Sequence, residues 1–238
     1  MKVRDTHRKS ILIFIFISFV LYLLYYLVFG KPEVIIESFF LNIAFLPLLV
    51  LFTTFVLDEL LKIREKPLLY RKKNTTIGLF YSEMGLFLLK LLSQSNKNTL
   101  RLSANLLFSE KWTSEDFIEA KTLTIATPFE LVDSDFGPLS FFLNERRKFM
   151  LTLLQNPILA EDRSFNFLIL SIFHLQQELF QRSSIGPLTP ADIDHLTTDI
   201  ERIYSSLIIE WLNYLENISK NYPHLYSLEV RTNPFKDL

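Results

Sequence analysis

Two long apolar runs lie close together near the start of this chain and constrain its fold more than any other feature. Ile11–Phe29 and Phe39–Leu57 each contain nineteen residues without a charged side chain. An α-helix rises about 1.5 Å per residue, so roughly 20 apolar residues are needed to cross the hydrocarbon core of a bilayer. Each run therefore has the length of one crossing. We expect two transmembrane spans, at about residues 11–29 and 36–57.

The segment between the runs predicts a tight reversal. Gly30 and Pro32 are residues typical of a turn that follows a helix, so we expect residues 11–57 to form an antiparallel helical hairpin. A cleaved signal peptide is a poorer explanation, because its apolar core would be shorter and would end at small residues. Two core helices of a soluble protein are a poorer explanation still, since both would need a protein partner around every face.

Basic residues predict the orientation of this hairpin. They gather in the N-terminal residues 1–10 and in the juxtamembrane segment 58–74, whereas the connector 30–38 holds one Lys and two Glu. Short segments rich in Lys and Arg stay on the cytoplasmic side. We therefore expect a multi-pass protein of the cell membrane (plasma or inner), with both termini cytoplasmic. The basic juxtamembrane side chains either contact anionic lipid headgroups or act only as a topology signal. The candidates for headgroup contact are Lys62, Arg64, Lys66, Arg71, Lys72 and Lys73.

The remaining residues, 75–238, are numerous enough to form one cytoplasmic domain with its own core. The whole chain has 25 basic and 26 acidic residues, of which 11 and 6 lie in residues 1–73, so the rest is acidic. An acidic domain argues against nucleic acid as a partner, because phosphates require a basic surface. The chain has no cysteine, which excludes disulfides, thiolate zinc sites and cysteine catalysis. Glycine-rich phosphate or dinucleotide motifs are also missing, so we expect no cofactor.

Apolar spacing in this domain is mostly helical, so the predicted fold class is all-α, with a helical bundle after the hairpin. Ser114 is expected to be the N-cap of one helix, and Thr189 the N-cap of the longest, which Pro223 ends. The segment 100–108 is ambiguous between helix and strand. Helices are predicted over residues 76–93, 114–124, 138–155, 164–182 and about 189–221.

The longest predicted helix carries an apolar stripe whose members recur at steps of three and four. Packing inside its own domain explains the stripe better than a dimeric coiled coil, because fewer than four heptads are covered. We nevertheless expect a homo-oligomer or a protein partner. The candidates for helix–helix or oligomer contact are Asn42 in the second apolar run and Ile193, Leu196, Ile200, Ile203, Leu207 and Trp211 in the stripe.

Polar side chains on the last two predicted helices are the only candidates for a metal site. His174 and Glu178 are four residues apart, and Asp192, His195 and Asp199 are spaced by three and four, so each set shares one helical face. Facing helices that carry carboxylates and imidazoles can hold a divalent metal. The pattern lacks a repeated Glu-x-x-His motif, however, and ion pairing on the helix surface is the simpler interpretation. We therefore expect no resident metal and no catalytic residue.

The function expected from these features is anchoring, with protein–protein interaction, scaffolding or sensing by the cytoplasmic domain. One alternative is an oligomeric two-span channel or pore-forming effector that this domain gates. Another is a metal-dependent, membrane-anchored enzyme, which the absence of a recognisable catalytic motif makes the weakest of the three.

Overall fold

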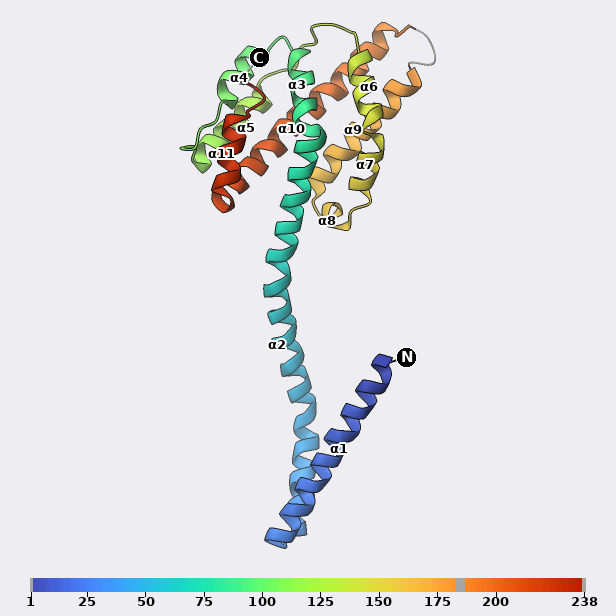
Figure 1. The fold of residues 1–238 in the computed structure, drawn as a ribbon, viewed down its shortest axis with the longest axis vertical. Coiled ribbons are helices and arrows are strands. Elements are labelled where there is room, and N and C mark those ends of the chain that lie inside the picture. The colour runs from blue at the N-terminus through green and yellow to red at the C-terminus, as the bar shows by residue number, and fades with distance from the viewer. Residues whose placement is uncertain (1, 183–186, 237–238) are drawn as a thin grey trace. The chain divides into compact units, whose positions relative to one another are not determined.

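A computed structural model describes residues 2–182 and 187–236, and within these ranges it describes the side chains except at 2–11 and 64–66. Every regular element in the described ranges is a helix (Figure 1), and an isolated antiparallel bridge joins Asn96 and Leu131. The predicted all-α class is therefore confirmed. The chain divides into two compact units, Met1–Lys66 and Pro67–Leu238.

The first unit contains α1 (Lys2–Phe29) and the beginning of α2 (Pro32–Phe80). Gly30 separates the two helices with a φ of +63°, in the left-handed region that favours glycine. Its N–H donates to the carbonyl of Tyr26 at 2.9 Å, which closes the end of α1 in the manner of a glycine C-cap. Proline then occupies the first position of α2, where its missing N–H costs nothing. The predicted break between two helices at Gly30 and Pro32 is thus confirmed.

The apolar side chains of this unit are uncovered. Two helical stretches, Leu12–Phe29 and Pro32–Gln94, are long and apolar enough to cross a membrane by length and composition. In the most apolar window of each stretch, no residue is buried inside the chain. The helix that contains the second run also continues far beyond residue 57, and it includes both Pro47 and Pro67.

Polar side chains of α1 and α2 either line a pocket between the two helices or form hydrogen bonds within α2. A pocket of about 450 Å³ between α1 and α2 is lined by Tyr22, Tyr25, Ser38 and Asn42, among others. Thr53 and Thr54 donate their hydroxyl hydrogens to carbonyls one turn back in α2, at 2.8 Å each. Asn42 therefore lies on the side of α2 that faces α1, whereas the two threonine hydroxyls bond within their own helix and not across helices.

The second unit is a bundle arranged around α10 (Pro190–Asn221), which contacts α3, α5, α9 and α11. Trp211 and Leu207 of α10 are fully buried in the common core. The other helices of the unit are the end of α2, α3 (Leu86–Gln94), α4 (Thr99–Leu106), α5 (Ser114–Ala126), α6 (Gly137–Glu145), α7 (Arg147–Leu154), α8 (Pro157–Ala160), α9 (Arg163–Arg182) and α11 (Pro223–Arg231).

Most predicted helices of this unit are present, and three details are wrong. The N-cap of α5 is Thr113, not Ser114, because Thr113 and Asp116 form a reciprocal capping box. Residues 138–155 form two helices that are interrupted at Arg146, and both of them contact α9. Pro223 does end α10, but it also occupies the first position of α11, a helix that we did not expect. The ambiguous segment 100–108 is helical as far as Leu106, within α4.

The predicted helix over 76–93 contains a π-helical turn, Tyr81–Gly85, labelled η1, between α2 and α3. An added Cβ at Gly85 would lie 2.6 Å from Cδ1 of Tyr81 and 2.9 Å from Cε1 of Phe80, so only glycine fits beside these rings. The Tyr81 hydroxyl donates to the carbonyl of Leu207 at 3.0 Å, and burial raises the pKa of this phenol well above its usual value. The π-helical turn that follows α2 is therefore joined to α10 by this hydrogen bond.

Replacing Gly85 with Ala should destabilise the second unit by about 1–3 kcal/mol, because the new methyl group collides with two buried rings. Both tryptophans, Trp112 and Trp211, lie in this unit, so their fluorescence during urea unfolding of the detergent-solubilised chain reports its stability. Ser82→Ala, at an exposed position of the same turn, is the matched control and should change little. Equal stability of the two variants would contradict this account of the π-turn.

An ion pair joins α5 to α10. Glu216 of α10 lies 2.8 Å from Lys121 of α5 and 2.9 Å from Lys220 of α10. Burial alone disfavours the charged carboxylate, but hydrogen bonds and the positive charges of both lysines outweigh it and lower the Glu216 pKa to about 2. The carboxylate side chain is 21% exposed, so solvent screens these interactions only in part.

Glu216→Gln should lower the free energy of unfolding at pH 7 by on the order of 1–2 kcal/mol, after allowance for screening. A depressed pKa in the folded state stabilises above the ordinary carboxyl pKa of 4.5, and this contribution is lost as pH falls toward about 2. The difference in unfolding free energy between wild type and variant should therefore become smaller as the pH falls from about 4.5 to about 2, as measured by urea unfolding. Glu119→Gln, an exposed position on α5, should show no such difference.

Candidate functional site

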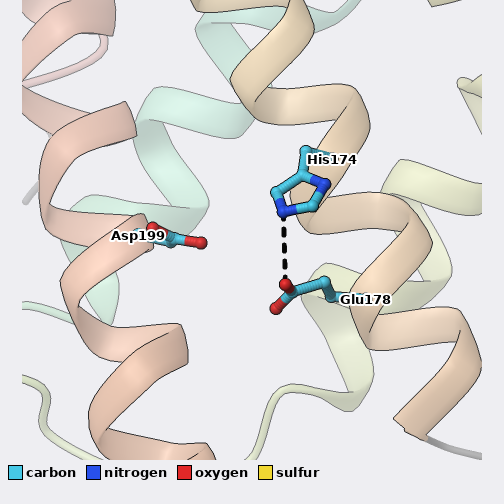
Figure 2. A group of neighbouring side chains, drawn as sticks. All are labelled: His174, Glu178 and Asp199. Atoms are coloured by element: carbon cyan, nitrogen blue, oxygen red, sulfur yellow. Dashed lines mark ion pairs between the residues drawn. The ribbon is translucent and has the colours of Figure 1, made fainter.

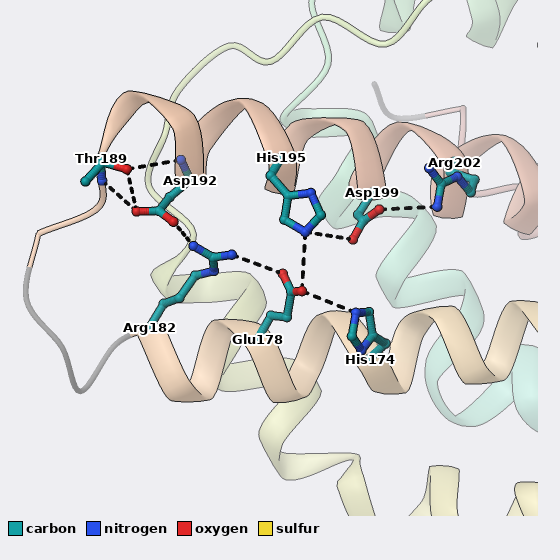
Figure 3. A network of polar contacts seen from close by, with 8 residues as sticks. All are labelled: His174, Glu178, Arg182, Thr189, Asp192, His195, Asp199 and Arg202. Carbon is teal, nitrogen blue, oxygen red and sulfur yellow. Dashed lines mark hydrogen bonds and ion pairs between the residues drawn. The ribbon is translucent and has the colours of Figure 1, made fainter.

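A polar network on α9 and α10 brings together the five residues that the sequence marked as metal candidates (Figure 3). Its position follows from the start of α10. The Thr189 N–H donates to Oδ2 of Asp192 at 3.0 Å, and the Asp192 N–H donates to Oγ1 of Thr189 at 3.2 Å. This capping box confirms the predicted helix start, and Pro190 follows at the first helical position. The capping box sets the residue at which α10 begins, and therefore which of its polar side chains face α9.

Glu178 is the centre of the network. Its Oε1 lies 3.2 Å from Nε2 of His174 and 3.3 Å from Nε2 of His195, so imidazoles from both helices converge on one oxygen. The other oxygen lies 3.6 Å from Nη2 of Arg182. The Glu178 side chain is only 17% exposed, although the two histidines stand at the surface. One largely buried carboxylate therefore organises three nitrogen-bearing side chains.

Two further carboxylates complete the network. Asp199 lies 3.7 Å from Nε2 of His195 and 3.4 Å from Nη1 of Arg202. Asp192 forms an ion pair with Arg182, in addition to its role as a cap. Sequence analysis had not included the two arginines. Their spacing, four residues after Glu178 and three after Asp199, is the signal that was available for them.

The donor atoms are close enough to act together. Ligand atoms of His174, Glu178 and Asp199 all lie within 4.8 Å of one another (Figure 2). Imidazole nitrogens and carboxylate oxygens are groups that ligate divalent metals, and they are also groups that form hydrogen-bonded ion networks. The arrangement is thus suited either to a closed network of ion pairs or to holding one cation between the two helices.

The residues expected at lipid headgroups have different surroundings. Lys62, Arg71 and Lys72 are exposed. Lys73 instead pairs with Asp162 of its own unit at 3.0 Å. Burial of Asp162 opposes its ionisation, but the hydrogen bond and charge of Lys73 prevail and lower the Asp162 pKa. The side chains of Arg64 and Lys66 lie outside the described residues.

The apolar stripe of α10 faces inward. Ile193 is half-buried against the core, and the other five members are at most 2% exposed. They therefore contact neighbouring helices of the same domain and do not form a free surface for a second subunit. The five buried members are Leu196, Ile200, Ile203, Leu207 and Trp211.

Comparison with known proteins agrees with this division of the chain. Residues 2–61 match a family described as "MJ1433, N-terminal helical domain", and residues 69–231 match "Uncharacterized protein MJ1433, C-terminal helical domain". The chain belongs to the MJ1433 family. A relative with the name "Uncharacterized protein MJ1433", from Methanocaldococcus jannaschii, is 37% identical over 223 residues, which cover 93% of this chain and 90% of the relative. No solved structure matches the chain.

Asp192→Ala should destabilise the second unit by about 1–2 kcal/mol, because it removes half of the capping box and leaves Arg182 without this ion pair. Asp194→Ala is the matched control, since Asp194 is an exposed acid two residues further along α10. Its loss should cost a few tenths of a kcal/mol, about the value of one charge near a helix N-terminus. Urea unfolding followed by tryptophan fluorescence measures both. Similar losses for the two variants would show that only the charge matters.

Proposed function

We propose that this MJ1433-family protein is an integral membrane protein whose N-terminal hairpin anchors a helical domain at the cytoplasmic face of the membrane. The domain is proposed to mediate protein–protein interaction, scaffolding or sensing there. The single observation that carries the proposal is a contrast in burial. The most apolar windows of α1 and α2 have no buried residue, whereas the second unit contains a complete core of its own.

Exposure on this scale requires a cover. Soluble monomers rarely present contiguous apolar patches larger than a few hundred Å². Here, large apolar side chains such as Phe14, Leu27, Phe40 and Phe55 are between 67% and 73% exposed along two successive helices. A bilayer covers such helices on every face, and helical backbone satisfies its own hydrogen bonds there.

The polar groups of the hairpin are compatible with a lipid environment. The hydroxyls of Thr53 and Thr54 bond to carbonyls in α2, which is how such side chains are satisfied in hydrocarbon. Asn42 and Ser38 line the pocket between the helices, where polar side chains strengthen helix association in membranes. The shared pocket supports a pair of spans over two independent ones.

The interaction role is supported by a groove on the second unit. It has a volume of about 680 Å³ and lies between the end of α2, α10 and α11. Leu79, Leu225 and Leu228 line it, and each is more than a third exposed. An apolar groove of this kind suits contact with a protein partner better than it suits catalysis.

The test exploits the absence of cysteine from the chain, which makes single-cysteine labelling free of background. Lys31→Cys, in the connector, should react with a membrane-impermeant maleimide in intact cells. Glu119→Cys, at an exposed position of α5, should react only after the membrane is permeabilised. Both variants should sediment with membranes and resist alkaline extraction.

Three outcomes would contradict the proposal. Recovery of the chain in the soluble fraction would exclude the anchor, and labelling of Glu119→Cys in intact cells would reverse the topology. Reproducible single-channel currents from the purified protein in planar bilayers would replace anchoring with pore formation.

A further inference from the structure

We propose that the network between α9 and α10 is a binding site for a divalent transition-metal ion, best matched to Zn²⁺, with His174, Glu178, His195 and Asp199 as ligands. This inference goes beyond the proposed anchoring function and does not depend on it, because all four residues lie in the second unit.

The donor set has a regular origin in the sequence. On α9, His174 precedes Glu178 by four residues, and on α10, His195 precedes Asp199 by four. Residues four apart share a helical face, so each helix offers one imidazole and one carboxylate to its neighbour. Two imidazoles with two carboxylates form a nitrogen and oxygen set that Zn²⁺ accepts.

Three of the six distances between the four donors are close to those around a tetrahedral ion. Zinc binds imidazole nitrogen at about 2.0–2.1 Å and carboxylate oxygen at about 2.0–2.2 Å, so two ligands at a tetrahedral angle are about 3.3–3.5 Å apart. Glu178 Oε1 lies 3.2 Å from Nε2 of His174 and 3.3 Å from Nε2 of His195. Asp199 Oδ2 lies 3.7 Å from Nε2 of His195. Three edges of such a tetrahedron are therefore within a few tenths of an ångström of their required lengths. The ligand atoms of His174, Glu178 and Asp199 lie within 4.8 Å of one another, and His195 is outside that group, so its ring would have to move closer for all four residues to bind one ion.

An unsatisfied atom provides an independent reason for a cation at this position. Glu178 Oε2 is buried and has no hydrogen-bond partner among the described residues. Its charged neighbour Arg182 is 3.6 Å away and also forms an ion pair with Asp192. A buried carboxylate oxygen without a hydrogen bond is costly. An ion bound by both oxygens of Glu178 would compensate for that cost, whereas an ion bound by Oε1 alone would not.

The surroundings also support the carboxylate ligands. Arg182 contacts Glu178, and Arg202 contacts Asp199, so each carboxylate is oriented by an outer partner as is usual around bound metals. The two arginines do not neutralise the three carboxylates Asp192, Glu178 and Asp199, so a net negative charge remains to attract a cation. His174 and His195 are 64% and 50% exposed, which leaves the ion a path from solvent.

The experiment uses the full-length chain in detergent after treatment with a chelator. Zn²⁺ binding is measured by equilibrium dialysis with elemental analysis, and the unfolding temperature is measured with and without Zn²⁺. We expect one Zn²⁺ per chain and a higher unfolding temperature when Zn²⁺ is bound. His174→Ala and His195→Ala should each weaken binding at least about 100-fold, since even outer partners of a metal change affinity about 10–100-fold.

His224→Ala is the matched control, because His224 lies on α11, outside the network, and its loss should leave Zn²⁺ affinity and stoichiometry unchanged. Co²⁺ added to the wild-type chain gives a readout that needs no variant. A tetrahedral site should produce intense visible absorption that Zn²⁺ then displaces. Absence of Zn²⁺ binding by the wild-type chain, or binding that survives His174→Ala together with His195→Ala, would overturn the proposal and leave a network of ion pairs.

Discussion

Burial of α10 is the interaction on which the second unit depends. Four helices contact α10, namely its sequence neighbours α9 and α11 and the more distant α3 and α5, and its apolar stripe reaches full burial at Leu207 and Trp211. This helix of 32 residues is the element against which its neighbouring helices pack. The π-turn and Glu216 act on the same helix, one through the Tyr81 hydroxyl on the Leu207 carbonyl and the other through Lys121 of α5. The polar network with α9 then uses the face of α10 that the core leaves free.

The sequence predicted this central element well because its signals are local. Thr189, Pro190 and Asp192 specify where α10 begins through backbone groups no more than three residues apart, and the apolar spacing specifies which face is buried. The candidate site was partly accessible for the same reason. The pairs His174–Glu178 and His195–Asp199 follow from helical spacing alone. The convergence of both histidines on one Glu178 oxygen depends on how α9 packs against α10, which no local pattern encodes.

The features that the sequence missed depend on tertiary packing or on ambiguous signals. The interruption at Arg146 has no glycine or proline to mark it, and it arises where two short helices both contact α9. Pro223 was interpreted only as a helix stop, although proline is equally suited to the first turn of the next helix. The π-turn was hidden in a regular apolar stripe, and Gly85 was its one visible mark. At Arg146 and at the π-turn, the backbone accommodates contacts with residues distant in the sequence.

The two ends of α9 lie near two different contacts, one with α2 and the other with α10 at the proposed metal site. Asp162 accepts a hydrogen bond from the Phe165 N–H at 3.3 Å, near the start of α9, and it also pairs with Lys73 of α2. Near the opposite end, Glu178 joins α9 to α10. An ion bound at Glu178 would hold α9 against α10 and would thereby stabilise the Lys73–Asp162 pair at the far end of the same helix. A sensing role at the membrane would need a connection of this kind between the ion and α2.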